Sequence, residues 1–216
     1  AKQTVIDIYK IQNISKVTII PDGNYIDAYP NEVTKKEARE YLDLGTEFVY
    51  LFFGRIRPYK GVNQLIDSFR QIQTGEEILY VTGSPSTSDI ERDIRSSAGE
   101  DTQIRTDLKY IPDENIQYYM NAADVLVLPY QDILNSGSVY LGLSFGIPII
   151  APEIGCIPSI VPEDNDLLFN TCGSQHLTER MCDVKRSNLS DIREINYARA
   201  KDYTWDQSAS QYYRLY

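Results

Sequence analysis

The sequence predicts an α/β fold: a doubly wound, Rossmann-like parallel sheet with helices on both faces. Short apolar runs of strand length recur along the chain, and most of them are separated by segments with helical periodicity. The strand-like runs are continuously apolar instead of alternating between apolar and polar residues. Continuous apolar strands that alternate with helices are typical of a parallel sheet covered on both faces.

The apolar runs give five expected strands: Val17–Ile20, Phe48–Phe53, Ile78–Val81, Val125–Leu128 and Ile149–Ala151. The helical patterns give the expected helices Lys35–Leu42, Gly61–Ile72, Ser88–Ser97, Glu114–Ala122 and Ser138–Phe145. After Leu168 the pattern is helical only, and it ends in a terminal helix within residues 203–216. Thr204 or Asp206 is expected to cap that helix, because both side chains accept hydrogen bonds from free N–H groups.

The length of 216 residues is sufficient for one domain with a substantial core, so residues 1–216 are expected to form a single domain. The three cysteines, Cys156, Cys172 and Cys182, are odd in number and lack metal-ligand spacing. This pattern favours reduced thiols, and no run of apolar residues is long enough to cross a bilayer. We therefore expect a soluble, cytoplasmic chain.

The formal net charge of -10 disfavours nucleic acid as a partner, because phosphate backbones are bound mainly by basic surfaces. The same charge disfavours an anionic membrane surface. Against this acidic background, the segment Arg55–Lys60 contains three cations and no carboxylate. A basic loop that is simply solvated is the alternative to a binding site here.

The segment Gly54–Gly61 is predicted to bind phosphate. It follows the apolar run Phe48–Phe53 and precedes a segment with the periodicity of one helical face, so the order is strand, glycine turn, basic loop and helix. A helix start has unpaired N–H groups and the positive end of the helix dipole, which stabilise an anion. Arg55 and Lys60 would add full positive charges.

A second phosphate candidate lies at Asn135, Ser136, Gly137 and Ser138, between a strand and a helix start. These residues are small and polar, so their N–H groups and hydroxyls can approach a ligand closely. Simple capping of the helix by Ser136 or Ser138 is the alternative. Ligands of doubly wound sheets bind outside the carboxyl ends of the strands, where the sequence puts Gly54, Gly83 and Pro129.

An ordered set of segments carries a family resemblance: Ile20–Gly23, Gly54–Arg55, Lys60–Gly61, Thr82–Pro85, Ala123–Pro129, Phe145–Pro152 and, at the end, Trp205–Leu215. The set resembles the nucleotide-sugar half of retaining glycosyltransferases with the GT-B fold, the group 1 family. Such enzymes have two Rossmann-like domains, and this chain is similar to the C-terminal one. The resemblance implies that an acceptor-binding domain would precede Ala1. Transfer, and any peripheral contact with a membrane, would then require that domain.

The resemblance also implies the ligand and the residues that bind it. The substrate would be a nucleotide-diphosphate sugar, linked to UDP or GDP, used without a cofactor or a metal to make a surface polysaccharide or glycolipid. Arg55 and Lys60 would stabilise the leaving diphosphate, and the helix that starts near Ser138 would hold it from the other side. The implied binding set is Gly54, Arg55, Lys60, Gly61, Gly83, Asn135, Ser136, Gly137 and Ser138. Family members retain the anomeric configuration.

The chain departs from the family pattern at two positions. Relatives carry two glutamates eight residues apart, one near the sugar and one on the ribose; here these positions hold Ile133 and Leu141. Asp132 is adjacent to the first and is a candidate substitute, and Asp22 stands where relatives often have histidine or asparagine. Two alternatives therefore stay open: a non-catalytic sugar-nucleotide-binding module and a GT-B nucleotide-sugar epimerase.

Other motifs are weaker. Asp164-Asn165-Asp166 has the form of a metal-binding motif of a different glycosyltransferase fold, but its turn-rich surroundings favour a turn. His176 lies in a polar segment without triad partners, which is typical of a surface histidine. A dinucleotide oxidoreductase is disfavoured, because the glycine-rich turn of that class is absent.

Overall fold

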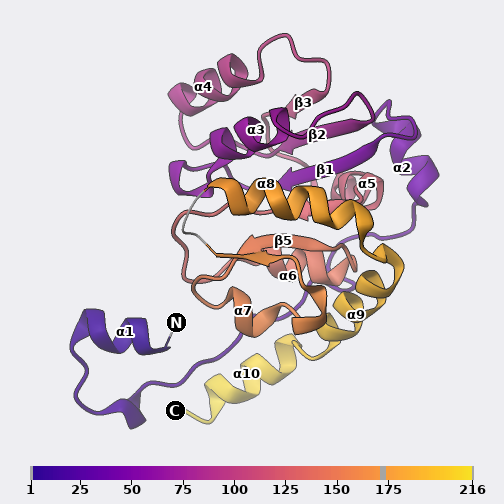
Figure 1. The fold of residues 1–216 in the computed structure, drawn as a ribbon. Coiled ribbons are helices and arrows are strands. Elements are labelled where there is room, and N and C mark those ends of the chain that lie inside the picture. The colour runs from indigo at the N-terminus through magenta and orange to yellow at the C-terminus, as the bar shows by residue number, and fades with distance from the viewer. Residues whose placement is uncertain (1, 171–173, 216) are drawn as a thin grey trace.

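The computed structural model describes residues 2–170 and 174–215, and these form a six-stranded parallel sheet with helices on both faces (Figure 1). The strands are β1 (Phe48–Phe53), β2 (Glu77–Thr82), β3 (Ile104–Asp107), β4 (Val125–Val127), β5 (Ile149–Pro152) and β6 (Leu168–Phe169). Their spatial order is β3-β2-β1-β4-β5-β6. The chain begins the sheet near its middle and winds outward in both directions, so the doubly wound prediction is confirmed.

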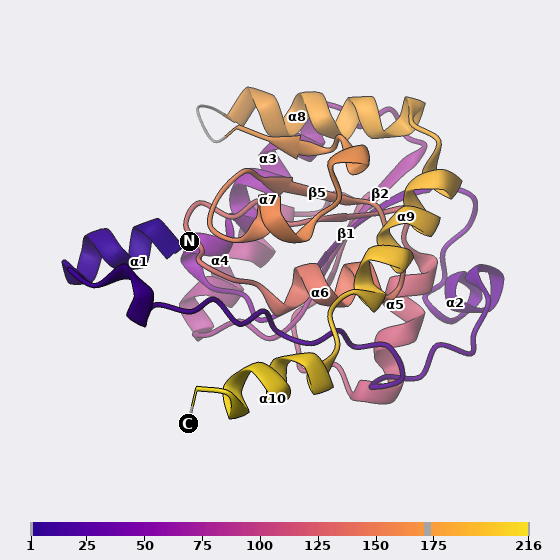
Figure 2. The same ribbon diagram turned by 90° about the horizontal axis from the view of Figure 1, so that it is seen from below.

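Within the described residues the helices are α1 (Lys2–Tyr9), α2 (Lys35–Tyr41), α3 (Val62–Arg70), α4 (Ser88–Ala98), α5 (Ile116–Ala122), α6 (Gly137–Ser144), α7 (Ile157–Ile160), α8 (Ser174–Asp183), α9 (Leu189–Lys201) and α10 (Trp205–Tyr213). Short 3-10 turns occur at η1 (Ile14–Lys16), η2 (Pro58–Lys60), η3 (Asp113–Asn115), η4 (Glu163–Asn165) and η5 (Val184–Arg186). Figure 2 shows α3 and α8 on one face of the sheet and α5 and α6 on the other.

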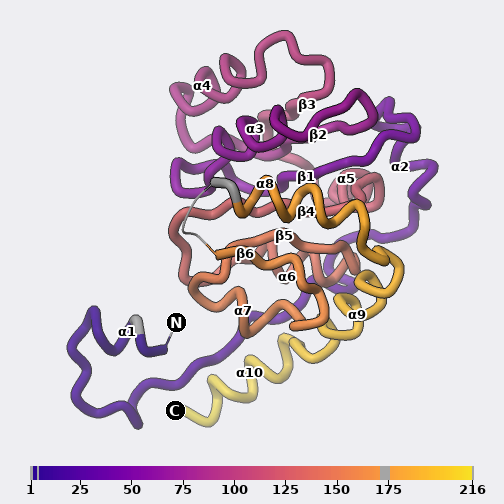
Figure 3. Tube along the Cα trace, viewed as in Figure 1, coloured from indigo at the N-terminus to yellow at the C-terminus, as the bar shows by residue number. Residues whose placement is uncertain are grey.

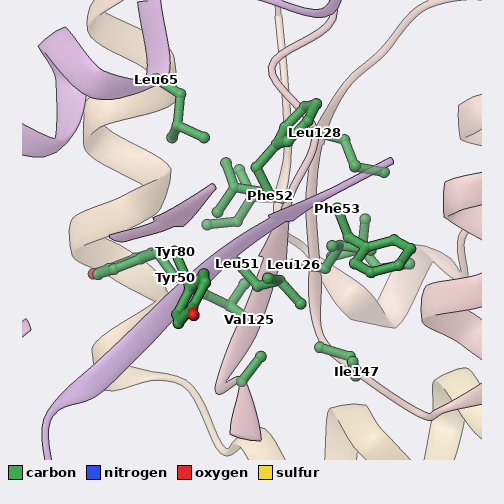
Figure 4. Packing of buried hydrophobic residues seen from close by; sticks show 14 of the residues in the cluster. Tyr50, Leu51, Phe52, Phe53, Leu65, Tyr80, Val125, Leu126, Leu128 and Ile147 are labelled. Atoms are coloured by element: carbon green, nitrogen blue, oxygen red, sulfur yellow. The ribbon is translucent and has the colours of Figure 1, made fainter. Parts of the chain in front are cut away.

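The core is centred on β1, whose residues from Val49 to Phe52 are at most 1% exposed (Figure 4). Both faces of this strand are covered, which explains why its sequence is continuously apolar. Leu65 and Phe69 of α3 are fully buried one turn apart, so they form part of the helical face that packs on the sheet. The apolar residues that predicted β1 and α3 are therefore the ones that the structure buries.

A buried carboxylate fixes α2 against the sheet. Asp124 accepts hydrogen bonds from Arg39 Nη2 at 2.8 Å and from the N–H of Val49 at 2.7 Å, and it also pairs with Lys35. These partners compensate for its burial, because an unpaired carboxylate there would be costly. Asp124 thus joins α2, β1 and the beginning of β4.

The expected strand Val17–Ile20 is wrong. This segment is an extended chain outside the sheet, and Ile19 is 54% exposed. Figure 3 shows the chain from α1 passing alongside α10 before it reaches α2. An apolar run of four residues forms a strand only when a neighbouring strand pairs with it, and none lies beside this one in the described structure.

The sequence prediction also missed two strands and the helices α1 and α7. Strand β3 has the sequence Ile-Arg-Thr-Asp and lies at a sheet edge, so it lacks the continuous apolar character of a central strand. Strand β6 is only two residues long, at the other edge. The expected central strands and helices are all present, with ends shifted by a few residues.

Helix α10 folds back onto the segment that precedes α2. The Nε1–H of Trp205 donates to the carbonyl of Asn24 at 2.8 Å, and the hydroxyl of Ser208 donates to that of Pro21 at 2.7 Å. Thr204 accepts from the N–H of Gln207 at 3.1 Å, so Thr204 is the cap of this helix. Among residues 2–170 and 174–215, no helix has the length and apolar character that crossing a membrane requires.

Candidate functional site

Two glycines bring the ends of β1 and β2 into contact at one rim of the sheet. Gly54 and Gly83 both have positive φ, at 136° and 135°. A Cβ atom added to Gly83 would lie 1.9 Å from the carbonyl oxygen of Gly54, and one added to Gly54 would lie 2.8 Å from Ser138 Oγ. Only glycine permits this approach, so the end of β1 lies against the start of α6.

Lys60 lies in the loop that follows Gly54, and its ammonium group is buried. The residue is 9% exposed, and its Nζ donates a hydrogen bond to the hydroxyl of Tyr130 at 2.9 Å. The same Nζ lies 4.0 Å from the centre of the Tyr130 ring, which is a cation–π distance. The pKa of Lys60 is lowered to about 8, mainly by burial; Tyr59 raises the pKa and the charge of Arg57 lowers it, both by less than burial does.

The start of α6 is free of side-chain capping within the described structure. Ser136 occupies the cap position, but its hydroxyl bonds to the hydroxyl of Tyr130 at 2.9 Å instead of to the helix N–H groups. The capping alternative for Ser136 is therefore wrong. The N–H of Val139 donates to the carbonyl of Ser136 at 3.1 Å, whereas the N–H groups of Gly137 and Ser138, which begin the helix without a bulky side chain, keep their ability to bind an anion.

The loop after β1 and the loop after β4 are joined to one another by the backbone. The N–H of Gln131 donates to the carbonyl of Tyr59 at 2.8 Å. Gly61 has a φ of 69°, and a Cβ added there would lie 2.1 Å from the carbonyl oxygen of Pro129. The structure therefore brings the two predicted phosphate segments together, although they are about 75 positions apart in the sequence.

Arg55 is exposed and lines a pocket of about 500 Å³ at the carboxyl ends of β1, β2 and β3. The pocket is bounded by Tyr29, Phe53, Gly54, Arg55, Gly83, Ser84, Lys109, Tyr110, Ile111, Asp113 and Ile116. Its size is within the usual range for small-molecule sites. It adjoins the rim formed by Gly54 and Gly83, so a ligand can extend from the pocket toward α6.

Asp22 and Tyr25 connect the segment before α2 to the start of α6. Asn135 Nδ2 donates to Asp22 Oδ2 at 2.6 Å, and Asn135 Oδ1 accepts from the N–H of Ser136 at 2.9 Å. The hydroxyl of Tyr25 lies 3.0 Å from where a Cβ on Gly137 would be. Asp22 thus has a structural partner, which gives this unassigned residue a role in orienting Asn135.

Ile133 and Leu141, which stand where the family resemblance implies glutamates, lie in the loop before α6 and on α6. Leu141 is buried on α6, and Ile133 is half-buried in the loop that precedes it. Neither side chain can accept a hydrogen bond. Asp132 is exposed in the same loop, so its carboxylate is accessible to a ligand.

The two motifs judged structural have structural roles. Asn165 is buried and its amide bonds to the backbone of Ile149, while Asp166 adopts a left-handed turn conformation with a φ of 40°. His176 is partly exposed and lies 3.4 Å from Glu179 on the same helix. The turn and surface interpretations are confirmed.

Cys156 and Cys182 are free thiols, and Cys172 lies outside the described residues.

Sequence reasoning missed Tyr130, the residue that contacts both halves of the site. It is 2% exposed, and burial raises the pKa of its hydroxyl to about 12, so it is a neutral donor and acceptor at physiological pH. Its position directly after a buried strand and Pro129 is the one signal that the sequence offers. Together, Lys60, the uncapped helix and the adjoining pocket have the charge and size to accept an anionic molecule with a larger organic part, which makes them the candidate site.

Comparison with known proteins shows the family of this chain. The family model described as "Glycosyl transferases group 1" matches residues 47–186. A "GDP-mannose:glycolipid 4-beta-D-mannosyltransferase" of Xanthomonas campestris pv. campestris is 35% identical over 102 residues, which are 47% of this chain and 29% of that protein.

Solved structures share the fold at low identity. Sucrose-phosphate synthase from Thermosynechococcus elongatus aligns with a TM-score of 0.78 at 21% identity, over 100% of this chain and 55% of its own. Anabaena HepE in complex with UDP and glucose aligns with a TM-score of 0.81 at 20% identity, over 96% of this chain and 58% of its own. The chain therefore spans little more than half of these structures. Because the family model covers well over half of the chain, the chain belongs to the group 1 glycosyl transferases.

Proposed function

We propose that this chain is the donor-binding part of a glycosyltransferase that transfers a sugar from a nucleotide-diphosphate sugar to an acceptor. The observation that carries the proposal is the buried ammonium of Lys60 beside the uncapped start of α6. A lysine is rarely buried without a paired carboxylate, and here its one hydrogen-bond partner among the described residues is the neutral hydroxyl of Tyr130. A diphosphate supplies the missing negative charge.

The diphosphate would lie between Lys60 and the first turn of α6, with Arg55 at the edge of the adjoining pocket. Gly54 and Gly83 leave room for a close approach, and Gly137 and Ser138 present N–H groups. The nucleoside would occupy the pocket of about 500 Å³. A UDP- or GDP-linked donor is proposed, since the Xanthomonas relative is named for GDP-mannose and the Anabaena HepE structure is a complex with UDP and glucose.

The same groups would assist the reaction. Transfer breaks the bond between the anomeric carbon and the diphosphate, so negative charge develops on the leaving phosphate. Fixed cations and N–H groups stabilise that charge without the reorganisation that water would need. We propose that Lys60 and Arg55 fulfil this role, that no metal ion is required, and that Asp132 lies near the transferred sugar. The acceptor would bind to a separate N-terminal domain.

For the stereochemistry of transfer, we propose retention first and inversion second. The family resemblance implies retention of configuration. Inversion is the second candidate, because the 35% identical relative is named for a β-linked mannosyl product. An α-linked sugar donor gives a β-linked product only by inversion. The one-bond NMR coupling between the anomeric carbon and its proton in the product distinguishes the two, because it differs between the α and β anomers even for a mannosyl product.

The non-catalytic binder and the nucleotide-sugar epimerase are the competing functions, and Leu141 is the observation that favours the non-catalytic binder. A leucine cannot accept a hydrogen bond from a ribose hydroxyl, so the ribose contact that family members make is missing here. A degenerate binder would bind the nucleotide sugar and leave it intact. An epimerase would change the sugar without needing an acceptor.

The test is a thermal-shift panel with UDP, GDP, ADP and their sugar conjugates, with and without a chelator, followed by a transfer assay of the full protein. A ligand at a hundred times its dissociation constant stabilises the folded state by about 2.7 kcal/mol, which gives a clear shift. Sugar transfer in the presence of chelator supports the proposal. Binding without transfer supports the degenerate binder, sugar conversion without acceptor supports the epimerase, and no shift with any nucleotide contradicts all three.

A further inference from the structure

Tyr130 lies at the centre of the anion site without being one of its charged groups. Its hydroxyl accepts a hydrogen bond from Lys60 at 2.9 Å and bonds to the hydroxyl of Ser136 at 2.9 Å. All three residues are buried, so these bonds are shielded from water. Lys60 comes from the loop after β1, whereas Ser136 comes immediately before α6.

We propose that Tyr130 is a positioning residue that fixes the ammonium of Lys60 in register with the start of α6 before a nucleotide binds. This inference rests on the proposed function. The ring of Tyr130 faces the Lys60 ammonium, with the nitrogen 4.0 Å from the ring centre, so the side chain restrains the ammonium by its ring and by its hydroxyl. Such preorganisation lowers the entropy that a ligand must remove on binding.

The hydrogen-bond directions extend the inference to Ser136. An ammonium can only donate, so the Tyr130 oxygen is the acceptor in that bond. The single hydroxyl proton of Tyr130 is then available to Ser136 Oγ. With its oxygen occupied in this way, Ser136 is left with a hydroxyl proton of its own to donate to a phosphate oxygen. The tyrosine therefore orients one cation and one neutral donor toward the same anion.

The hydroxyl also helps to keep Lys60 charged. Burial lowers the pKa of this lysine to about 8, and a hydrogen bond accepted from the ammonium favours its protonated form. Among the described residues, Tyr59 raises the pKa of Lys60 and Arg57 lowers it, both from its own loop, and the hydroxyl of Tyr130 contacts the ammonium from the opposite side. On the α6 side, Tyr130 meets the uncharged hydroxyls of Ser136 and Ser138.

The decisive experiment measures the dissociation constants of UDP and GDP between pH 6.5 and 9.5 for the wild-type protein and for Tyr130→Phe. Phenylalanine keeps the ring and removes the hydroxyl. We expect binding to weaken about tenfold at pH 7.5, as is typical for loss of a hydrogen bond to a charged group. We also expect the alkaline loss of affinity to begin at a lower pH, because Lys60 loses its proton more easily without that bond.

Tyr50→Phe is the matched control. The Tyr50 hydroxyl is also buried and donates to the carbonyl of Met181 at 2.6 Å, but Tyr50 is not part of the anion site. The control should lose stability without changing the affinity or its pH profile. If Tyr130→Phe binds UDP and GDP as tightly as the wild type does, the positioning role is refuted while the proposed function stands. The same conclusion follows if the variant binds them more weakly but its affinity has the pH profile of the wild type.

Ser136→Ala provides a second variant if Tyr130→Phe fails to fold. It removes the hydroxyl that lies 2.9 Å from that of Tyr130, so the Tyr130 hydroxyl keeps Ser138 beside it and is less firmly directed. A smaller shift of the pH profile in the same direction supports the proposal, and an unshifted profile contradicts it. If the wild-type protein binds neither UDP nor GDP at any pH, the proposed function fails first and the inference fails with it.

Discussion

Burying the Lys60 ammonium is unfavourable for folding, and the same buried charge would favour binding of the proposed anion. Its ammonium is buried beside a neutral hydroxyl, so the folded apo protein carries a desolvated charge that an anion would neutralise. The sequence indicated the chemistry of this lysine, because it lies in a basic loop between a strand and a helix. It did not indicate the burial, because the covering residue, Tyr130, is 70 positions away.

Replacing Lys60 with methionine should therefore separate stability from binding. We expect Lys60→Met to raise the free energy of unfolding of the apo protein by on the order of 1 kcal/mol, because a buried charge is replaced by an apolar side chain of similar length. Nucleotide affinity should fall at least tenfold. Urea unfolding and titration calorimetry measure the two effects. Lys36→Met, at an exposed lysine of α2, should change neither.

The pH dependence of stability has a defined sign. The pKa of Lys60 is about 8 in the folded protein and 10.5 for an ordinary lysine, so between these values the unfolded chain binds more protons. Stability then rises with pH in this window. The rise attributed to Lys60 is the difference between wild type and Lys60→Met, and equal pH profiles for the two proteins would contradict the burial of the charge.

A substitution at Gly83 tests the close approach of the ends of β1 and β2. A Cβ there would lie 1.9 Å from the Gly54 carbonyl oxygen, and the φ of 135° is unfavourable for other residues, so Gly83→Ala should cost about 3 kcal/mol or more. Gly75→Ala is the control, because Gly75 also has a positive φ but nothing within 4 Å of an added Cβ. It should cost about 1 kcal/mol by chemical denaturation. Equal costs would refute the steric explanation.

At the scale of elements, helix α10 shows how a distant segment supports the site. It holds the chain near Pro21 and Asn24 through the hydroxyl of Ser208 and the indole of Trp205. The neighbouring Asp22 in turn bonds to Asn135 at the start of α6. The sequence predicted this helix and its cap but not its partner, because the expected strand Val17–Ile20 left that segment within the sheet.

Removing the Thr204 side chain that caps α10 should destabilise the protein. Thr204→Ala removes the acceptor of the Gln207 N–H, and we expect a loss of about 1 kcal/mol in the free energy of unfolding. Ser210→Ala, at an exposed position within the same helix, should be neutral or slightly stabilising, because alanine has the higher helix propensity. Thermal unfolding of both variants measures the difference. A loss as large in Ser210→Ala would indicate that the helix body, and not its cap, is sensitive.

At the scale of the whole molecule, the alternation of apolar strands and amphipathic helices was enough to predict the sheet type and the rim that carries the candidate site. The edges of the sheet were not predictable, because β3 is partly polar and β6 has two residues, so neither shows the burial pattern of a central strand. The order of the strands brings Lys60 and Ser136 together. Such contacts depend on tertiary packing, which one-dimensional patterns do not contain.

The central claim is that Lys60 and the start of α6 bind the diphosphate of a nucleotide. Calorimetric dissociation constants of GDP, GMP, UDP and UMP for the wild-type protein and for Lys60→Met test it, because residues and ligand groups that interact give non-additive losses. We predict that removing the terminal phosphate weakens binding at least tenfold in the wild type and much less in the variant. Equal losses in the two proteins would contradict the claim, because the lysine would then have no contact with the diphosphate.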